Sequence, residues 1–437
     1  MRHIILTLII LATAAATAVA ASLTIEGSSH QVIVVKPEKS TGLDEILVVF
    51  STRGCTAVYT ASAPGSQVTW QKFGYMGAGY AEDVDRSLVS QSGTRSVLSI
   101  VEPDMGYAVT ENGRTYYVWV TDYSSHPCTI TGLSSAPEQE CDRTFLTVEG
   151  QAPRIVYHTI TGQGLTLSRD IKLTYNTLVA TDDNTRYNQV PVEKTIEYTD
   201  GSINVEAPLC NTTFHLRGDR FLEQWGMARE VTSPLIDAQC VQALVSAKKV
   251  VRTAENEVKT EDTLGGSAPV EIEFSATPSD AAIFTEWQMA TDAEFNNIVY
   301  RNQQIDFSHT FYEMGTTYVR FMAANASGSC EFYSETYTVN IGESSLLCPN
   351  AFSPGATPGV NDEWRVSYKS IIEFECYIFN RWGKKLAEFH NPAQGWDGKD
   401  GGKSVPAGVY YYVIKAKGAD GKKYDLSGDI NILNYTD

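Results

Sequence analysis

The feature that most constrains this chain is a recurring pattern of short apolar runs, rich in β-branched and aromatic residues, separated by Gly, Asn, Asp, Ser and Pro. Examples are residues 46–50, 116–120, 155–157, 318–321 and 410–414. Sustained helical periodicity is hard to find, and the best case, near 241–251, is short and precedes a polar tract. Many short strands with frequent turn signals are typical of β-sandwiches in series. The sequence therefore predicts an all-β fold.

Length and charge narrow the class of protein further. The 437 residues exceed one ordinary domain of about 100–200 residues, so several domains are expected. Lys and Arg number 34 against 52 Asp and Glu, a formal net charge of −18, which argues against a nucleic-acid partner or an anionic membrane surface. The hydrophobic fraction of 43% excludes wholesale disorder. Abundant tyrosine (23) and scarce histidine (7) suit strands and surfaces better than metal or acid–base chemistry.

The N-terminal residues predict a signal peptide over residues 1–20. Arg2 gives a positive start, residues 4–11 form an apolar run, and Ala18-Val19-Ala20 has the small-x-small form that signal peptidase cleaves after. The apolar run is too short for a membrane-spanning helix of about 20 residues. The alternative is a buried N-terminal helix. No later stretch is long and apolar enough to span a membrane, so we expect an exported mature chain without a transmembrane segment.

Export changes how the cysteines are interpreted. In an oxidising compartment an even number favours disulfides over metal ligands, and no C-x-x-C pair suggests zinc. We expect a Cys55–Cys128 bridge across the first sandwich, and Cys240 as the partner of Cys330. Connectivity cannot be deduced from sequence alone, so all eight cysteines remain disulfide candidates: Cys55, Cys128, Cys141, Cys210, Cys240, Cys330, Cys348 and Cys376.

A weak internal repeat supports the sandwich interpretation. Each copy has a Trp-Gln pair, a later Gly-x-Thr-Tyr segment and a final cysteine, with the same spacing from glycine to cysteine: Trp70, Gly113, Cys128 and Trp287, Gly315, Cys330. The pattern predicts a core tryptophan on one strand and a tyrosine-led strand opposite it. Residues 317–325 also resemble the F strand of fibronectin type III and related immunoglobulin-like domains. That resemblance concerns the fold and says nothing of a ligand.

The C-terminal residues contain several linked motifs. Asn-Ala-Phe-Ser-Pro at 350–354 is followed by Asn361-Asp362, Asn-Arg-Trp-Gly at 380–383, Trp-Asp-Gly at 396–398 and a Pro-Ala-Gly-Val-Tyr segment at 406–410. Their order and spacing closely resemble the gliding-motility-associated C-terminal domain, the type B sorting domain of the type IX secretion system of Bacteroidota. The residues that carry the resemblance are Asn350, Phe352, Pro354, Asn361, Asp362, Asn380, Arg381, Trp382, Gly383, Trp396, Asp397, Gly398, Pro406, Gly408 and Tyr410.

This resemblance implies a compact β-sandwich that the outer-membrane translocon and its type B sorting partners recognise after the chain reaches the periplasm. Delivery to the cell surface or the medium would follow. One departure is that residues 355–358 replace the family's Asn-Gly-Asp-Gly turn, so a calcium-binding role of that loop is not expected. Cys348 and Cys376 fall where the family has apolar residues, on strands that are candidates for neighbours, and we expect them to be bridged.

Elementary chemistry gives the same motif residues structural roles. We expect the Trp382 indole to cover the core while the Arg381 guanidinium stays in water or stacks on it. Trp396 is expected to anchor a turn, and Pro406 and Gly408 to begin the next strand.

The predicted organisation is a series of tandem immunoglobulin/fibronectin-III-like sandwiches with a small C-terminal sorting domain. The expected boundaries are a signal peptide at 1–20, an Ig/PKD-like sandwich at 21–135, a second β domain at 136–246, a linker at 247–266, an Ig/FnIII-like sandwich at 267–345, and the sorting domain at 346–437.

No catalytic, cofactor-binding or metal-binding residues are predicted. The chain contains neither H-E-x-x-H nor G-x-S-x-G, and Gly402-Lys403-Ser404 lacks the first glycine of a phosphate-binding loop. Arg217-Gly218-Asp219 matches the integrin tripeptide, but its flanks predict a strand end. We therefore expect a non-catalytic exported protein that binds a surface glycan, a protein or neighbouring copies. The alternatives are an accessory or envelope-signalling component of the secretion machinery and, less favoured, a secreted glycan-active enzyme.

Overall fold

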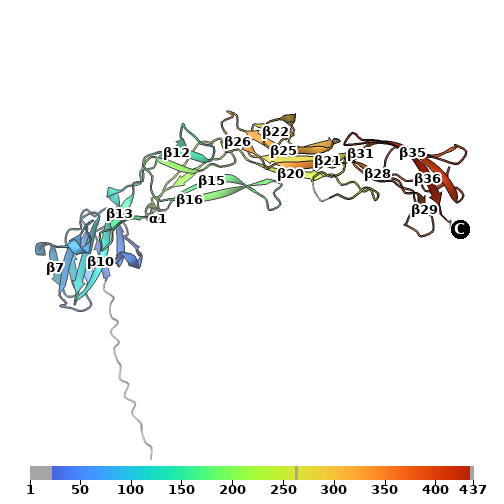
Figure 1. Ribbon diagram of the computed structural model, residues 1–437. Coiled ribbons are helices and arrows are strands. Elements are labelled where there is room, and N and C mark those ends of the chain that lie inside the picture. Colours follow the sequence, from blue (N-terminus) through green and yellow to red (C-terminus); the bar gives the residue numbers. More distant parts are fainter. Residues whose placement is uncertain (1–21, 261–263, 434–437) are drawn as a thin grey trace, which may run out of the picture.

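The computed structural model describes residues 22–260 and 264–433, and over these residues the chain is a series of β-sandwich units (Figure 1). The predicted signal peptide, residues 1–20, lies outside the described residues. The units follow one another in an elongated arrangement, with the first at one end and the C-terminal unit at the other. The first unit lies at an angle to the rest, near β13 and α1. The predicted all-β tandem architecture is confirmed.

The first unit packs a four-stranded sheet against a six-stranded sheet. The smaller sheet has the order β1 (Ser22–Glu26), β4 (Thr56–Thr60), β8 (Arg95–Leu98), β7 (Val89–Ser92). The larger has the order β2 (Ile33–Val35), β3 (Glu45–Val49), β10 (Arg114–Asp122), β9 (Met105–Glu111), β5 (Val68–Phe73), β6 (Glu82–Asp83). The neighbours β3 and β10 run parallel, and the predicted core tryptophan, Trp70 on β5, is 4% exposed.

Strand β3 is continuously apolar from Ile46 to Val49 because both faces of its sheet are covered. Leu47 and Val49 pack toward the smaller sheet, whereas Ile46 and Val48 pack into a second cluster. That second cluster includes Ile155 from the hairpin of β13 (Ile155–His158) and β14 (Gly164–Leu167), which belong to the following unit. A strand buried on both faces is expected to have a continuous apolar run rather than strict alternation. The first and second units therefore share a hydrophobic cluster at their joint, in addition to the core of each.

Besides the β13–β14 hairpin, the second unit contains two larger antiparallel sheets and one short helix, α1 (Arg220–Gln224). One sheet has the order β11 (Gly132–Ser135), β12 (Arg143–Glu149), β17 (Ser202–Glu206). The other has the order β16 (Tyr187–Ile196), β15 (Ile171–Ala180), β18 (His215–Arg217), β19 (Glu230–Thr232). Leu146, Ile171, Leu173 and Phe214 lie in the core between them.

The third unit is a sandwich centred on Trp287, which is fully buried. One sheet has the order β20 (Ala243–Lys249), β21 (Val270–Pro278), β24 (Phe307–Phe311). The other has the order β23 (Ile298–Asn302), β22 (Phe284–Ala290), β25 (Gly315–Ala324), β26 (Glu331–Tyr333), with β27 (Tyr337–Ile341) also pairing with β25. The core tryptophan on β22 pairs with the tyrosine-led strand β25, as the repeat predicted.

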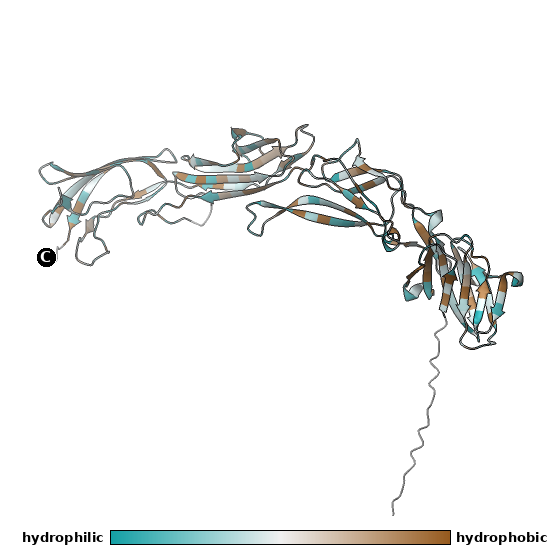
Figure 2. Ribbon diagram, turned by 180° about the vertical axis from the view of Figure 1, so that it is seen from behind, coloured by the Kyte–Doolittle hydropathy of each residue, from teal (hydrophilic) through white to brown (hydrophobic). Residues whose placement is uncertain are grey.

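The C-terminal unit is built on a five-stranded sheet. Its order is β29 (Ala351–Phe352), β36 (Lys423–Ile432), β35 (Gly408–Gly418), β31 (Ile371–Phe379), β32 (Lys385–Phe389). Two-stranded ladders accompany it, β28 (Ser345–Leu347) with β30 (Ser367–Lys369) and β33 (Lys399–Asp400) with β34 (Lys403–Ser404). Along strands such as these, apolar and polar residues alternate as bands of brown and teal in Figure 2, which is the pattern of a half-buried sheet.

The segment predicted as a linker is largely ordered against other units. Lys248 and Lys249 lie within β20, which pairs with β21 along its whole length. Residues 250–260, here called the strap, start against the third unit, where the Val250 N–H donates to the Glu271 carbonyl, and reach the C-terminal unit around Glu257. The Val258 N–H donates to the Tyr368 carbonyl at 2.8 Å, and the Asn256 Nδ2 donates to the Val366 carbonyl at 2.7 Å. The strap is thus part of the connection between β20 and β21 of the third unit, and it docks on the C-terminal unit, whereas the chain itself passes between these two units from β27 to β28.

The cysteines pair differently from the prediction. Cys141, just before β12, is bonded to Cys330, just before β26, with the Cα atoms 5.5 Å apart. The expected Cys240–Cys330 bridge is therefore wrong, because the turn between β25 and β26 lies against the second unit at Cys141. The remaining six are free thiols: Cys55, Cys128, Cys210, Cys240, Cys348 and Cys376.

The other two expected bridges are also absent from the structure. Cys55 lies in the core of the first sandwich, whereas Cys128 packs at the joint with the second unit, so the two belong to different clusters. Cys348 and Cys376 do share the core of the C-terminal unit, but Cys348 follows β28, which does not pair with β31. Burial raises the pKa of the Cys376 thiol to about 12, so its reactive thiolate form is scarce at neutral pH.

Candidate functional site

Several motif residues of the C-terminal unit form its aromatic core. Trp396 is 3% exposed, and its ring centroid lies 5.6 Å from that of Phe352 and 5.2 Å from that of Tyr410. The Trp396 Nε1–H donates to the Lys399 carbonyl at 2.9 Å, which satisfies the buried polar atom. Trp364, fully buried, pairs with Trp396 through the backbone. The predicted anchoring role of Trp396 agrees with this packing.

A second group of motif residues fixes loops. The Asp362 carboxylate accepts hydrogen bonds from the Gly355 N–H at 2.9 Å and the Gly359 N–H at 2.6 Å. These two backbone donors lower the pKa of Asp362, because they favour its charged form. Asn361 beside it has a φ of 53°, a left-handed conformation that asparagine tolerates. Asp362 therefore closes the loop in which the family's acidic turn is replaced.

The remaining loop residues of the motif act through backbone contacts. The Asn350 carbonyl accepts from the Asn431 N–H, the Pro406 carbonyl accepts from the Tyr410 hydroxyl at 2.7 Å, and the Gly398 carbonyl accepts from the Val405 N–H. Pro354 is buried, and the Asp397 carboxylate contacts Lys399. Gly408 begins β35 with a φ of 150°. These residues build the sandwich.

Asn380 locks the turn that joins β31 to β32. Its Oδ1 accepts from the Trp382 N–H and the Lys384 N–H, both at 3.0 Å, and its own N–H donates to the Lys384 carbonyl. Gly383 has a φ of 80°, which a residue with a Cβ adopts only with strain. The backbone of the turn is thus held at Asn380, Trp382, Gly383 and Lys384, since the Gly383 N–H also donates to the Asn380 carbonyl.

Trp382, at the tip of this turn, departs from its predicted role. It is 76% exposed and does not cover the core, which Trp396 and Tyr410 close instead. The turn carries residue 382 beyond the end of the sheet, so the indole has no core beneath it. Of the two alternatives expected for Arg381, the structure shows stacking, since the guanidinium carbon lies 4.4 Å from the Trp382 ring centroid.

An exposed apolar surface adjoins this turn. On the outward side of β35, Val409, Tyr411 and Val413 are 47%, 44% and 39% exposed. A hollow of about 500 Å³ is lined by Arg381, Trp382, Val409 and Tyr411 among others. We call the surface formed by Arg381, Trp382, Val409, Tyr411 and Val413 the Trp382 face.

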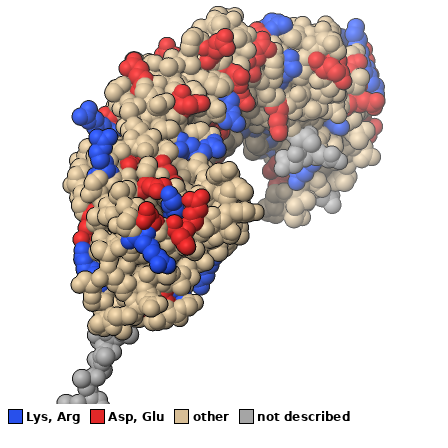
Figure 3. Space-filling model, turned by 90° about the vertical axis from the view of Figure 1, so that its left-hand side faces the viewer, with Lys and Arg blue, Asp and Glu red and all other residues tan. Residues whose placement is uncertain are grey.

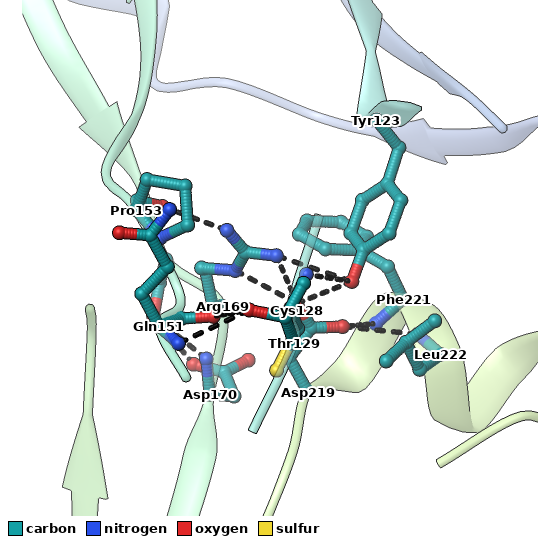
Figure 4. A network of polar contacts seen from close by, with 11 residues as sticks. Tyr123, Cys128, Thr129, Gln151, Pro153, Arg169, Asp170, Asp219, Phe221 and Leu222 are labelled. Atoms are coloured by element: carbon teal, nitrogen blue, oxygen red, sulfur yellow. Dashed lines mark hydrogen bonds and ion pairs between the residues drawn. The ribbon is translucent and has the colours of Figure 1, made fainter. Parts of the chain in front are cut away.

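A buried polar cluster, which the sequence did not predict, lies at the joint of the first two units (Figure 4). The side chains of Arg169 and Asp219 are both fully buried, and the Arg169 Nη2 lies 2.7 Å from the Asp219 Oδ2. The Tyr123 hydroxyl, from the end of β10, donates to Asp219 and accepts from Arg169, each at 3.1 Å. The Arg169 Nη1 donates to the Pro153 carbonyl. Every charge here has a partner, as a buried ion pair requires.

Asp219 also caps helix α1. Its Oδ1 accepts from the Phe221 and Leu222 N–H groups at 3.1 and 3.0 Å. The carboxylate of the Arg217-Gly218-Asp219 tripeptide is therefore buried inside the joint and is not presented to a receptor. No sequence pattern marked Arg169, which lies 50 residues from Asp219.

Comparisons with known proteins agree with this architecture. Residues 133–233 match the Fibronectin type III domain family, and residues 346–432 match the CHU_C Type IX secretion signal domain family. The first match covers most of the second unit and ends before β20, and the second covers the C-terminal unit. No curated protein matches the chain.

Some solved structures are similar to the chain at low identity. A tetra-tandem repeat from the extending region of a large adhesion protein is 12% identical, with 88% of this chain and 97% of that chain covered and a TM-score of 0.22. Fibronectin(III)-like modules of Clostridium thermocellum CbhA are 12% identical, with 44% and 98% covered and a TM-score of 0.18. Dimeric latent PorU from Porphyromonas gingivalis is 10% identical, with 74% and 36% covered and a TM-score of 0.16.

The fibronectin type III match thus falls on the second unit, whereas residues 317–325, which resemble an F strand, lie in the third; the match of the C-terminal unit to the type IX secretion signal domain confirms the motif resemblance. This signal indicates export to the cell surface or the medium. Over the described residues, no helix is long and apolar enough to cross a membrane.

Proposed function

We propose that this protein is a non-catalytic stalk of β-sandwich domains, exported through the outer-membrane type IX translocon by its C-terminal unit, and that its upstream domains adhere to a glycan or protein outside the cell. The observation that carries the proposal is the match of residues 346–432 to a type IX secretion signal domain. That region is a closed sandwich at one end of an elongated chain, so it is accessible to a receptor while the other domains remain folded.

The joints between units support a display role. The first joint contains the buried Arg169–Asp219 pair, the second is bridged by Cys141–Cys330, and the third is covered by the strap. A short polar linker leaves neighbouring domains free to reorient, whereas joints with buried contacts restrict them. A stiffened stalk holds its first domain away from the end that carries the sorting signal.

The first sandwich offers a candidate adhesive surface. Tyr75, Met76 and Tyr80 lie on one loop between β5 and β6 and are 71%, 46% and 69% exposed. Exposed tyrosines supply large contact areas with a hydroxyl for hydrogen bonding, which suits recognition of polar polymers and proteins. On the face drawn in Figure 3, acidic and basic side chains are interspersed with uncharged areas. We expect the extracellular ligand to bind through this loop.

The domain plan is adjusted accordingly. We propose that the third domain begins near Ala238 rather than at 267, because Ala238, Val241 and Ala243 pack in its core and β20 belongs to its sheet. The strap then serves as part of the C-terminal domain, with Ala254 packed against the core of that domain.

Deletion of residues 346–437 tests the proposal. The shortened chain is expected to accumulate in the periplasm, with its first two domains folded, because each has its own hydrophobic core. Fractionation and protease accessibility of intact cells measure its location, with the full chain as control. Arrival of the shortened chain at the surface would contradict the sorting role. A general loss of export of unrelated proteins after gene deletion would favour the accessory role instead.

A further inference from the structure

Unlike the other tryptophans of its domain, Trp382 does not pack in the hydrophobic core. Trp364 and Trp396 are 0% and 3% exposed, whereas Trp382 is 76% exposed. Leaving an indole in water forfeits the free energy of burying it, so a large exposed aromatic with apolar neighbours is typical of an interaction site.

The turn presents this indole in a fixed position. Asn380 holds the backbone at Trp382 and Lys384, and the Arg381 guanidinium stacks on the ring. A side chain that is already ordered loses less conformational entropy on binding, which favours affinity. The turn is therefore better suited to docking than a flexible loop carrying the same residues.

Arg381 gives this surface a positive charge, and that charge indicates which partner the surface favours. Its neighbours Lys384 and Lys385 are paired with Asp400 and Glu388. Among the residues that the structure describes, Arg381 has a ring contact but no ion-pair partner. A guanidinium without a carboxylate partner favours an acidic group on whatever docks here, because its fork of donors matches a carboxylate.

The sheet extends the surface beyond the turn. Val409 and Tyr411 line the hollow beside Trp382, and Val413 continues the exposed row along β35. Across from Tyr411 and Val413 on the neighbouring strand β31 lie Phe379 and Tyr377, both half-buried. The apolar surface is thus continuous from the turn onto the sheet, with the indole at one end.

We propose that the Trp382 face is the surface by which the C-terminal domain binds its receptor in the type IX machinery, and that the receptor offers an apolar recess flanked by carboxylates. This inference rests on the proposed function. The match of this domain to a secretion signal supplies the occupant, since a signal must be bound by the machinery that reads it. Trp and Arg are also the residues most enriched among those that dominate binding energy at interfaces.

The test uses the full chain in a host with a working type IX system. Trp382→Ala and Arg381→Glu are each expected to lower the surface fraction at least about tenfold, the loss expected when a dominant interface residue is removed. Trp382→Phe and Arg381→Lys should retain more export than these variants. Phe284→Ala is the matched control, because Phe284 is 55% exposed but lies in the third sandwich, and it should be exported normally.

A folding defect is separated from a docking defect by thermal melting of the purified variants. Substitutions at so exposed a site should shift Tm by no more than about 2 °C. Trp396→Ala provides the opposite case, since it should lose export through unfolding. If Trp382→Ala unfolds the domain, Arg381→Glu, which leaves the apolar contacts in place, carries the test.

The outcomes distinguish the two proposals. Export lost on deletion of 346–437 but retained by both Trp382→Ala and Arg381→Glu would overturn the docking surface and leave the sorting role standing. Export of the deletion itself would overturn both. If the wild-type chain self-associates in sedimentation experiments, and Trp382→Ala abolishes that while export is unchanged, the occupant is a second copy and the inference is wrong.

Discussion

Arg169 and Arg381 both stack on an aromatic ring, but their surroundings differ. The Arg169 guanidinium carbon lies 5.2 Å from the Tyr123 ring centroid, and its side chain is fully buried beside Asp219. Arg381 lies 4.4 Å from the Trp382 ring on an exposed turn, without an ion-pair partner among the described residues. The first arginine has all its interactions inside the chain, at the joint of two units. Arg381 has the ring contact but lacks the carboxylate partner that Arg169 has, and a docking surface requires such an available group.

The sharpest test of this comparison is the same substitution at both arginines. Arg169→Met should destabilise the protein by about 3–5 kcal/mol, because it leaves the Asp219 carboxylate buried without its charged partner. Arg381→Met should stay within about 0.5 kcal/mol of the wild type. Urea unfolding monitored by tryptophan fluorescence measures both. Equal effects at the two sites would break the comparison.

The second joint offers a covalent counterpart to the first. The Cys141–Cys330 bridge closes a segment of 189 residues, and a native disulfide typically contributes about 2–4 kcal/mol. Cys141→Ser paired with Cys330→Ser should therefore lower the free energy of unfolding of the second and third units by this amount. Calorimetry of the double variant measures the change. Cys210→Ser, which removes a buried free thiol, controls for the loss of a sulfur atom. A double variant as stable as the wild type would mean that the joint is held without the bridge.

The smallest predicted effect concerns Asp362 in the exposed loop. Like Asp219 in the buried joint, its carboxylate accepts two backbone hydrogen bonds. The pKa of Asp362 lies below its ordinary value of 3.8, so its contribution is complete above that value and is lost as the pH falls through the lowered pKa. Acidification through and below that lowered pKa should loosen the loop at Gly355 and Gly359 without unfolding the sandwich.

Amide hydrogen exchange of Gly355 and Gly359 measures this loosening, after correction for the intrinsic pH dependence of exchange. Asp362→Asn should exchange faster at neutral pH and show no further change on acidification. Protection in the wild type that persists unchanged after the Asp362 carboxylate has been protonated would contradict the assignment.

Local patterns were enough to predict the architecture. Short apolar runs between turn residues predicted the strands, and the position of Trp287 in the repeat predicted a buried core residue. The run at 46–50 is continuous because the hairpin of β13 and β14 covers the second face of its sheet, a contact that no local pattern reports. The motifs of the C-terminal domain were informative because most of their residues hold turns and core, which depend on nearby sequence.

Contacts between segments that lie far apart in the chain could not be predicted from local sequence patterns. Arg169 meets Asp219 across 50 residues, and Cys141 meets Cys330 across 189, so neither spacing leaves a local signal. The prediction that Trp382 covers the core failed for another reason. Whether a tryptophan at a turn covers the core depends on where the sheet ends beneath it, and that geometry follows from the pairing of β31, β32 and β35. The sequence predicts a linker at 247–266 because the partners of its polar tract, such as Tyr368, lie far along the chain.

Transfer of the signal to another protein tests the central claim most directly. Residues 238–437, which include the third sandwich, the strap and the C-terminal domain, are fused behind an inert reporter that is delivered to the periplasm of a host with a type IX system. The account predicts that the reporter reaches the surface or the medium, and that the same fusion carrying Trp382→Ala stays inside. A wild-type fusion that is folded, stable and retained in the periplasm would contradict it.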